Sequence, residues 1–226
     1  MLAPSLSHQE YGIVCAQTQV GVCNVLPKLR KKKSTKRKID LLIVAAAAPV
    51  WLPVLVLSAL AVKISDPSAP VLFSQDRTGY RGARFKMLKL RTMVSNAEEL
   101  KSQYREFSTV PWPDFKMDND PRITRLGKIF RKFRVDEMPQ ILNVISGDMT
   151  LIGPRPTSFN KETYKLWHTE RLDVVPGLTG SWQILGDSGM DFDGRSRLDI
   201  RYVRSADLML DARIFFQTFP AMCRGK

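Results

Sequence analysis

Two adjacent carboxylates, Asp136 and Glu137, are the side chains in this sequence best suited to chemistry. The segment before them is rich in basic residues, namely Arg125, Lys128, Arg131, Lys132 and Arg134. Pro139 and the apolar residues after it predict a short helix that ends near Gly147, so the two acids lie at or just before a helix N-terminus. Unpaired amides and the helix dipole at that end favour ionised carboxylates, as do neighbouring arginines. Helix capping needs only one acid, so the pair indicates a further role.

Two ionised carboxylates beside an arginine cluster indicate phosphate chemistry. One carboxylate can attack phosphorus as a nucleophile. The other can hold Mg2+, which prefers one or two carboxylates together with phosphate oxygens. Arginines then neutralise the phosphate oxygens in the transition state. The residue types alone leave open which acid has which role.

An amphipathic helix is predicted directly before the acid pair. Leu126, Ile129, Phe130 and Phe133 recur at helical spacing and share one face, while the basic residues occupy the other. A basic helix face is often only a solvated surface, and this alternative applies to the helix taken alone. The acid pair that follows favours a functional role for the basic face.

Three motifs around this segment resemble those of the bacterial sugar transferases, the monotopic polyprenyl-phosphate phosphoglycosyl transferases. They are NDPRITRLGKIFR from residue 119, DE-x-PQ-x-x-NV-x-x-GDM from residue 136, and LIGPRP from residue 151. The resemblance extends from about Lys36 to about Thr218, and the motifs occur in the family order.

The resemblance implies a two-stage reaction. Asp136 would be the nucleophile that attacks the sugar-bearing phosphate of a nucleotide-diphosphate sugar, taken to be a UDP-sugar, and releases UMP. The phosphosugar would then pass from this aspartyl intermediate to polyprenyl (undecaprenyl) phosphate. Glu137 would ligate the cofactor, Mg2+. The reaction would be the first membrane step of surface polysaccharide or glycoconjugate synthesis.

Four basic residues are candidates for binding the substrate phosphates. Arg131 lines up with a phosphate-binding arginine of the family, and the Gly-Pro-Arg-Pro turn presents Arg155. Arg77 and Lys89, together with Gln75, lie in a predicted β-hairpin that matches the family's F-x-Q-x-R-x-G-x-x-G-x-x-F segment. An ordinary basic edge strand is the alternative for each hairpin residue.

A glycine-rich segment from Pro176 to Gly186 matches the family pattern PG-x-TG-x-x-Q-x-x-G, and its backbone amides could cradle phosphate. The family commonly has a phosphate-binding arginine at the next position, whereas this sequence has Asp187. A carboxylate repels phosphate, so either Arg195 or Arg197 substitutes for the arginine or this function is weakened. An inactive family member is therefore one alternative.

The run from residue 41 to residue 62 contains no charged residue and is long enough for a membrane helix. Pro49 and Pro53 predict a break near Ala48-Pro49. Basic residues flank the run on both sides, and they favour the cytoplasmic side of a membrane. The sequence therefore predicts a re-entrant helix that returns to the face it entered. A buried core helix of a soluble protein is the rival interpretation.

The basic segment 28–38 precedes this run and is expected to contact anionic lipid. A disordered tail that binds nucleic acid is the alternative, but the apolar run directly after it favours the membrane. Asp40 stands at the membrane edge beside Arg37 and Lys38 and is expected to pair with a basic residue there.

Three further helices are predicted in the remainder of the chain. The first covers residues 95–107, with Ser95 and Glu98 as a capping box. The second covers residues 160–172, and the third starts at a capping Asp211.

Composition sets limits on the class of protein. The 226 residues, 44% of them hydrophobic, suffice for one sizeable domain with a packed core. A formal net charge of +13 indicates an anionic partner. The three cysteines show no metal-ligand spacing, and His8 and His168 are too isolated for a zinc site or a triad.

We therefore predict a mixed α/β fold, in which a small catalytic domain with amphipathic helices and a short β-hairpin is anchored by one re-entrant helix. Residues 1–38 form a basic arm, 39–64 the re-entrant membrane helix, and 65–226 the catalytic domain. The expected location is the cytoplasmic face of the bacterial inner membrane, with monotopic insertion.

The expected partners are a nucleotide-diphosphate sugar, polyprenyl phosphate and anionic membrane lipid. Nucleic acid is not expected, and a homo-oligomer is left open. The alternative function is that of a non-enzymatic, membrane-tethered basic module that binds anionic lipid or nucleic acid.

Overall fold

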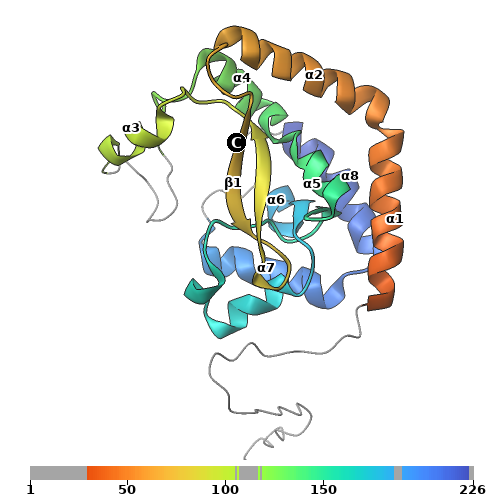
Figure 1. Cartoon of the computed structure of the whole chain (residues 1–226). Coiled ribbons are helices and arrows are strands. Elements are labelled where there is room, and N and C mark those ends of the chain that lie inside the picture. Colours follow the sequence, from red (N-terminus) through yellow and green to blue (C-terminus); the bar gives the residue numbers. More distant parts are fainter. Residues whose placement is uncertain (1–29, 105, 107–116, 118, 186–189, 224–226) are drawn as a thin grey trace, which may run out of the picture.

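A computed structural model describes residues 30–104, 106, 117, 119–185 and 190–223 (Figure 1). Helices dominate this part of the chain, which also holds two small two-stranded sheets. The predicted mixed α/β class is confirmed, with much more helix than sheet. Most of the predicted N-terminal arm, and Asp187, lie outside the described residues.

Two helices joined by a sharp break form the N-terminal part of the structure. Helix α1 spans Arg30–Ala46 and α2 spans Ala48–Ser65. The break therefore lies next to the predicted position, because Pro49 falls in the first turn of α2, where its missing N–H costs nothing. Figure 1 shows α1 along one side of the molecule and α2 crossing its end. Because α1 begins at Arg30, most of the basic segment is helical.

Helix α2 is apolar and largely uncovered. It has 18 residues and is long and apolar enough to cross a membrane, yet only 11% of it is buried in the structure. Val50, Leu57 and Ile64 are among its exposed side chains. A core helix of a soluble protein would be mostly buried, so the exposure favours contact with a membrane.

Polar contacts attach α1 to the rest of the chain. Asp40 is buried and accepts a hydrogen bond from the Thr150 hydroxyl. Arg37 donates to two backbone carbonyl oxygens in the last turn of α5, which spans Gln140–Ser146. Of the basic residues beside it, Lys36 acts on Asp40 through its charge, whereas Arg37 caps the C-terminus of α5 instead.

The predicted β-hairpin is confirmed. Strand β1, Leu72–Thr78, pairs antiparallel with β2, Arg84–Leu90, through a single 3-10 turn, η1, at Tyr80–Gly82. Lys89 of β2 lies opposite Phe73 of β1 in the register. Met87 and Leu90 point to opposite faces of β2, and each is buried in a different core cluster, so both faces of this strand help to hold the hairpin in place.

A second, parallel pair of strands brings two loops together. Strand β3, Thr150–Ile152, pairs with β4, Gly177–Thr179. A Cβ added to Gly177 would lie only 2.1 Å from the backbone nitrogen of Gly153, so this approach requires glycine. The Gly-Pro-Arg-Pro turn is thereby held beside the glycine-rich segment.

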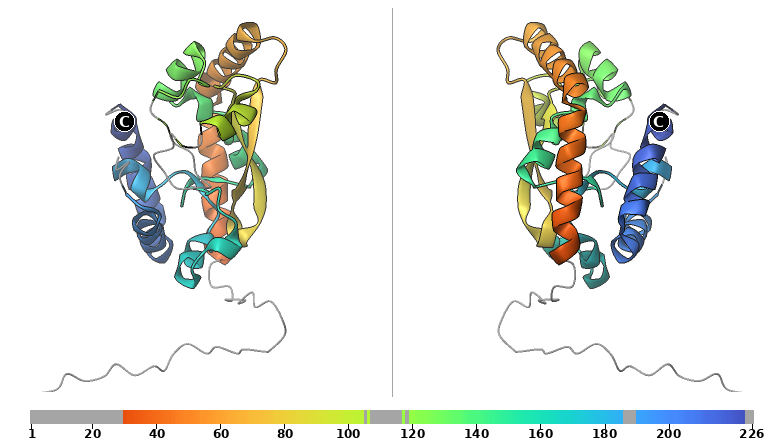
Figure 2. Two further views of the ribbon diagram at one scale, coloured as in Figure 1. Left: turned by 90° about the vertical axis from the view of Figure 1, so that its left-hand side faces the viewer. Right: turned by 90° about the vertical axis from the view of Figure 1, so that its right-hand side faces the viewer.

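The main core lies between two groups of elements. In the side views of Figure 2, helices α6, Ser181–Leu185, and α8, Leu208–Cys223, lie on one side, and α1 and the hairpin lie on the other. One buried cluster includes residues from α1, β2, α5, β3 and α8, namely Val44, Met87, Val144, Ile152 and Ile214. Helix α7, Phe192–Ser205, adds Tyr202 and Val203 to it.

Two of the three further helices differ from their prediction at the start. Helix α3 spans Ala97–Gln103, so Ser95 is not its N-cap. Helix α8 begins before Asp211, and Asp207 provides the cap by accepting a hydrogen bond of 2.7 Å from the backbone N–H of Leu210. Asp211 instead pairs with Lys36 at 2.5 Å and joins α8 to α1.

The predicted helix 160–172 is two short 3-10 segments, η4 at Lys161–Thr163 and η5 at Leu166–Leu172. The backbone of Lys165 is extended, which separates them. His168 is buried, and its ring bonds the Lys165 N–H and the Asp193 carboxylate. His168 therefore has a structural role, in contacts within the fold.

Candidate active site

Asp136 and Glu137 lie in a single 3-10 turn, η3 (Val135–Glu137), between α4 (Arg125–Lys132) and α5. Thr124 caps the start of α4 by accepting from the Gly127 N–H at 2.9 Å. Arg134 then adopts a left-handed conformation, with φ of 55°. A residue other than glycine pays about 1 kcal/mol or more for this conformation. It turns the chain sharply, so that the acid pair faces the hairpin rather than continuing α4.

Two cations converge on one oxygen of Glu137. The guanidinium of Arg155 lies 2.5 Å from its Oε1 atom, and the ammonium of Lys89 lies 3.3 Å from the same atom. Burial would raise the pKa of Glu137, but Arg155 and Lys89 outweigh it and hold that pKa well below its usual range. Glu137 is therefore ionised at neutral pH.

Asp136 has a different environment from its neighbour. Its side chain is buried. Burial raises the pKa of Asp136, and the Glu137 charge adds to the rise, while Lys89 and Arg131 oppose it. The two acids therefore differ in basicity, with Asp136 the more basic one. Such a separation of pKa values is typical of paired carboxylates with different chemical roles.

The other predicted phosphate-binding residues lie around this pair. Arg131 donates from Nε to the Thr92 hydroxyl at 2.9 Å, and its charge acts on Asp136. Arg77 donates to Gln75 at 2.6 Å, and its charge acts on Lys89. The structure thus gathers the two acids and the four cations that the sequence singled out, and Lys89 and Arg155 form ion pairs with Glu137.

A buried ion pair that the sequence analysis missed supports Arg155. Arg171 and Asp199 are almost fully buried and lie 2.5 Å apart. Arg171 also donates to the backbone oxygen of Arg155 at 2.9 Å and so fixes the Gly-Pro-Arg-Pro turn. Burial raises the pKa of Asp199 to about 6 against the opposing effect of Arg171, so the pair is still ionised at neutral pH. Asp199 stands in the stretch Leu198-Asp199-Ile200-Arg201-Tyr202-Val203, which matches the pattern LD-x-x-YV of the family resembled above, and this match was the available signal.

Asn143 provides a second support that sequence reasoning did not identify. Its side-chain amide donates to the Lys86 backbone oxygen and accepts from the Leu88 N–H, both at 2.9 Å. These bonds fasten α5 to β2, the strand that carries Lys89. Asn143 lies in the DE-x-PQ-x-x-NV motif, where its spacing from the acids marks it.

The acids fit one class of metal ion better than others. Within the described residues, no group of three or more His, Cys, Asp or Glu side chains could enclose a metal ion. Zinc and calcium sites normally need such a set of protein ligands. Mg2+ is commonly held by one or two carboxylates plus phosphate oxygens, so the pair of Asp136 and Glu137 fits Mg2+ with a phosphate ligand.

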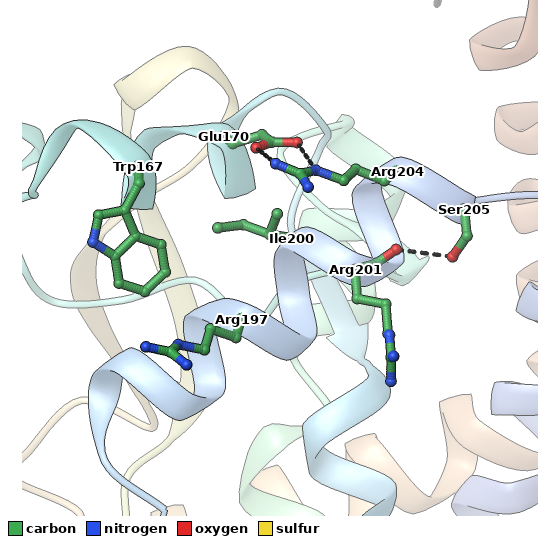
Figure 3. A pocket seen from close by; sticks show the side chains of 7 residues that line it. All are labelled: Trp167, Glu170, Arg197, Ile200, Arg201, Arg204 and Ser205. Atoms are coloured by element: carbon green, nitrogen blue, oxygen red, sulfur yellow. Dashed lines mark hydrogen bonds and ion pairs between the residues drawn. The ribbon is translucent and has the colours of Figure 1, made fainter. Parts of the chain in front are cut away.

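A pocket of about 590 Å3 lies elsewhere, between η5 and α7 (Figure 3). Its lining residues are Trp167, Glu170, Arg197, Ile200, Arg201, Arg204 and Ser205. None of the predicted site residues contributes to it, and Arg204 is already bound to Glu170 through two contacts of 2.6 and 2.7 Å. Arg197, one of the two arginines considered as a substitute for the family's phosphate-binding arginine, lines this pocket, whereas Arg195 donates to the Met190 backbone oxygen at 2.9 Å.

Comparison with known proteins identifies the class to which this fold and site belong. The family model for bacterial sugar transferases matches residues 31–225. The chain therefore belongs to the bacterial sugar transferase family, and the resemblance noted in the sequence is confirmed.

Individual relatives are similar over most of the chain. The exopolysaccharide production protein ExoY of Rhizobium meliloti is 36% identical over 196 residues, which cover 84% of this chain and 86% of that protein. The UDP-glucose:undecaprenyl-phosphate glucose-1-phosphate transferase of Caulobacter vibrioides is 35% identical over 198 residues, which cover 83% of this chain and 69% of that protein. The undecaprenyl-phosphate galactose phosphotransferase of Salmonella typhimurium is 34% identical, covering 86% of this chain but 42% of its own length.

The support of Arg155 can be tested with Asp199→Asn. The substitution leaves the buried Arg171 without a counter-charge, so we expect the free energy of unfolding to fall by about 3 kcal/mol or more. Thermal unfolding of the detergent-solubilised protein measures this. Asp191→Asn is the matched control, because Asp191 caps α7 at the surface and asparagine caps equally well. Equal stability of both variants would contradict the role of the buried pair.

Proposed function

We propose that this chain transfers a phosphosugar from a UDP-sugar to undecaprenyl phosphate, through a covalent intermediate on Asp136. The observation that carries the proposal is the buried acid pair, whose members differ in pKa and lie beside Lys89 and Arg155. Two of the relatives are named for the transfer of galactose phosphate or glucose 1-phosphate to undecaprenyl phosphate. We infer the substrate class of this chain from these relatives.

In the first stage, a carboxylate oxygen of Asp136 attacks the phosphorus that bears the sugar. A P–O bond to Asp136 forms, and the bond from that phosphorus to the bridging oxygen breaks, so UMP leaves with the electron pair. In the second stage, a phosphate oxygen of the lipid attacks the same phosphorus. The bond to Asp136 then breaks, which restores the carboxylate and yields a lipid diphosphate sugar.

The electrostatic surroundings of the two acids suit this division of roles. Asp136 makes no ion pair with any described residue, so its lone pairs are available for attack. The lowered pKa of Glu137 keeps this carboxylate ionised. We therefore assign Glu137 the role of metal ligand. Mg2+, when bound, would supply charge that neutralises the phosphate oxygens. Arg155, Lys89, Arg131 and Arg77 supply further positive charge for the diphosphate.

Exposed apolar side chains support a position of the acid pair near a lipid surface. Ile129 of α4 and Phe133, the residue directly after α4, are exposed before the turn that holds the two acids. Leu142 and Ile145 of α5 are exposed after this turn. The apolar faces predicted from the sequence are thus only partly packed in the core. Together with the uncovered α2, they support monotopic insertion, which would bring the lipid phosphate to Asp136. Basic flanks on both sides of the α1–α2 break favour the cytoplasmic face.

The non-enzymatic alternative explains the charge and the apolar helix but not the buried acids. A basic module that binds anionic lipid would gain nothing from burying Asp136 and Glu137 among its cations. The inactive-member alternative rests on Asp187, and turnover that appears only after Asp187→Arg would support it.

The reaction class can be tested by release of UMP. Purified protein in detergent is given Mg2+, undecaprenyl phosphate and a panel of UDP-sugars. We expect one sugar to yield UMP, and Asp136→Asn to lower the rate by at least about a thousandfold, because the nucleophile is lost. Asp76→Asn, which removes an exposed acid on β1, is the control and should retain the rate. Equal rates in the wild-type and Asp136→Asn proteins would refute the assigned nucleophile.

The pH dependence of kcat/KM tests the environment of Asp136. The nucleophile must be ionised, so activity should fall as the pH drops through the pKa of Asp136. Because burial raises that pKa, the acid limb should lie above the range of an ordinary aspartate. Lys89 opposes the rise, so Lys89→Gln should move the limb to still higher pH. A limb that stays in place would show that Lys89 does not act on the titrating group.

A further inference from the structure

The contacts of Glu137 bear on how a divalent cation reaches it. Both Arg155 and Lys89 lie against the same atom, Oε1, at 2.5 and 3.3 Å. The carboxylate is mostly buried, with a side-chain exposure of 16%, so water does little to weaken these contacts. Glu137 therefore already has its counter-charge before any substrate is present.

The balance of charge around the turn opposes a bare metal ion. Five cations act on the two acids or on each other, namely Arg77, Lys89, Arg131, Arg134 and Arg155. They outnumber the two acids. The charge of Asp120 also acts on Arg131, but Asp120 is itself paired with Arg122 at 2.6 Å, so the excess of positive charge remains. A divalent cation that approached alone would meet a site of net positive charge, which repels it.

A nucleotide diphosphate changes this balance. Its negative charge attracts the same cations, and the planar fork of a guanidinium suits phosphate oxygens as well as it suits a carboxylate. The backbone of Arg155 is fixed by its bond from Arg171, so only the side chain needs to move. Lys89 extends from β2, which Asn143 holds in place. Both cations can therefore change partner without any rearrangement of the fold.

We propose that Arg155 and Lys89 are an exchangeable counter-charge for Glu137. In the empty enzyme they hold Glu137 and exclude a bare divalent cation. When the donor binds, they move to its diphosphate and leave Glu137 available, so metal and donor occupy the site together. The identity of the donor in this inference rests on the proposed function.

Binding of Mn2+, a spectroscopic stand-in for Mg2+, tests the inference without catalysis. The free Mn2+ signal is followed by electron paramagnetic resonance in detergent, with the full chain, with and without UDP. Without UDP, the wild-type protein should not lower the free Mn2+ signal. With UDP, it should lower the signal more than UDP does in buffer without protein. Arg155→Gln should bind bare Mn2+ at least about tenfold more tightly than the wild type, because one repelling charge is gone.

Three further variants locate the effect. Arg155→Gln combined with Glu137→Gln should lose the gained affinity, which assigns it to Glu137. Arg201→Gln makes the same change in net charge within the pocket of Figure 3 and should behave like the wild type. If Arg155→Gln does not fold, Lys89→Gln replaces it and should show the same increase in affinity for bare Mn2+.

The outcomes separate this inference from the proposed function. Tight binding of bare Mn2+ by the wild type, or no gain in either Arg155→Gln or Lys89→Gln, would overturn the inference even if UMP release succeeds. If UDP does not cause the wild-type protein to bind Mn2+, the proposal that Arg155 and Lys89 move from Glu137 to the diphosphate is overturned. A gain in the variants together with no UMP release from any donor would leave the exclusion standing and count against the proposed function instead.

Discussion

The ionic contact between Glu137 and its two cations is the interaction on which the site depends. It joins three parts of the chain that are far apart in sequence, because Lys89 comes from the hairpin, Glu137 from the turn after α4, and Arg155 from the loop after β3. This contact also separates the pKa values of the two acids. Glu137 is held ionised by direct partners, whereas Asp136 is buried, forms no ion pair within the described part of the chain, and becomes the more basic group.

The surrounding structure mostly serves to keep these three segments in register. Asn143 fastens α5 to β2, the Arg171–Asp199 pair fixes the backbone of Arg155, and Arg37 caps the far end of α5. Each of these contacts replaces a backbone partner that would otherwise be lost at a helix end, strand edge or turn. Helix α1, which precedes the apolar α2, is therefore linked directly to the helix that follows the acids.

Local patterns predicted a large part of this arrangement. The hairpin, the break beside Pro49 and the short helix between Pro139 and Gly147 follow from nearby residues, since proline geometry, turn glycines and strand alternation act over a few positions. The gathering of Arg77, Lys89, Arg131 and Arg155 around the acids depended on the family motifs, because spacing alone does not bring four distant cations together. The buried Arg171–Asp199 pair was missed, since each residue looks like an ordinary surface charge in sequence. Asp211 was taken for a helix cap because its partners, Lys36 and Tyr202, are remote in the chain.

The central claim is that Asp136 carries the phosphosugar between the two stages, and the most direct measurement is the mass of the protein in the absence of acceptor. Protein is mixed with Mg2+ and UDP-glucose, UDP-galactose or UDP-N-acetylgalactosamine, without undecaprenyl phosphate. The account predicts one phosphosugar added per chain with the productive donor, mapped by fragmentation to Asp136, and an equal amount of UMP. UMP release without an adduct on the protein, or an adduct on another residue, would contradict it.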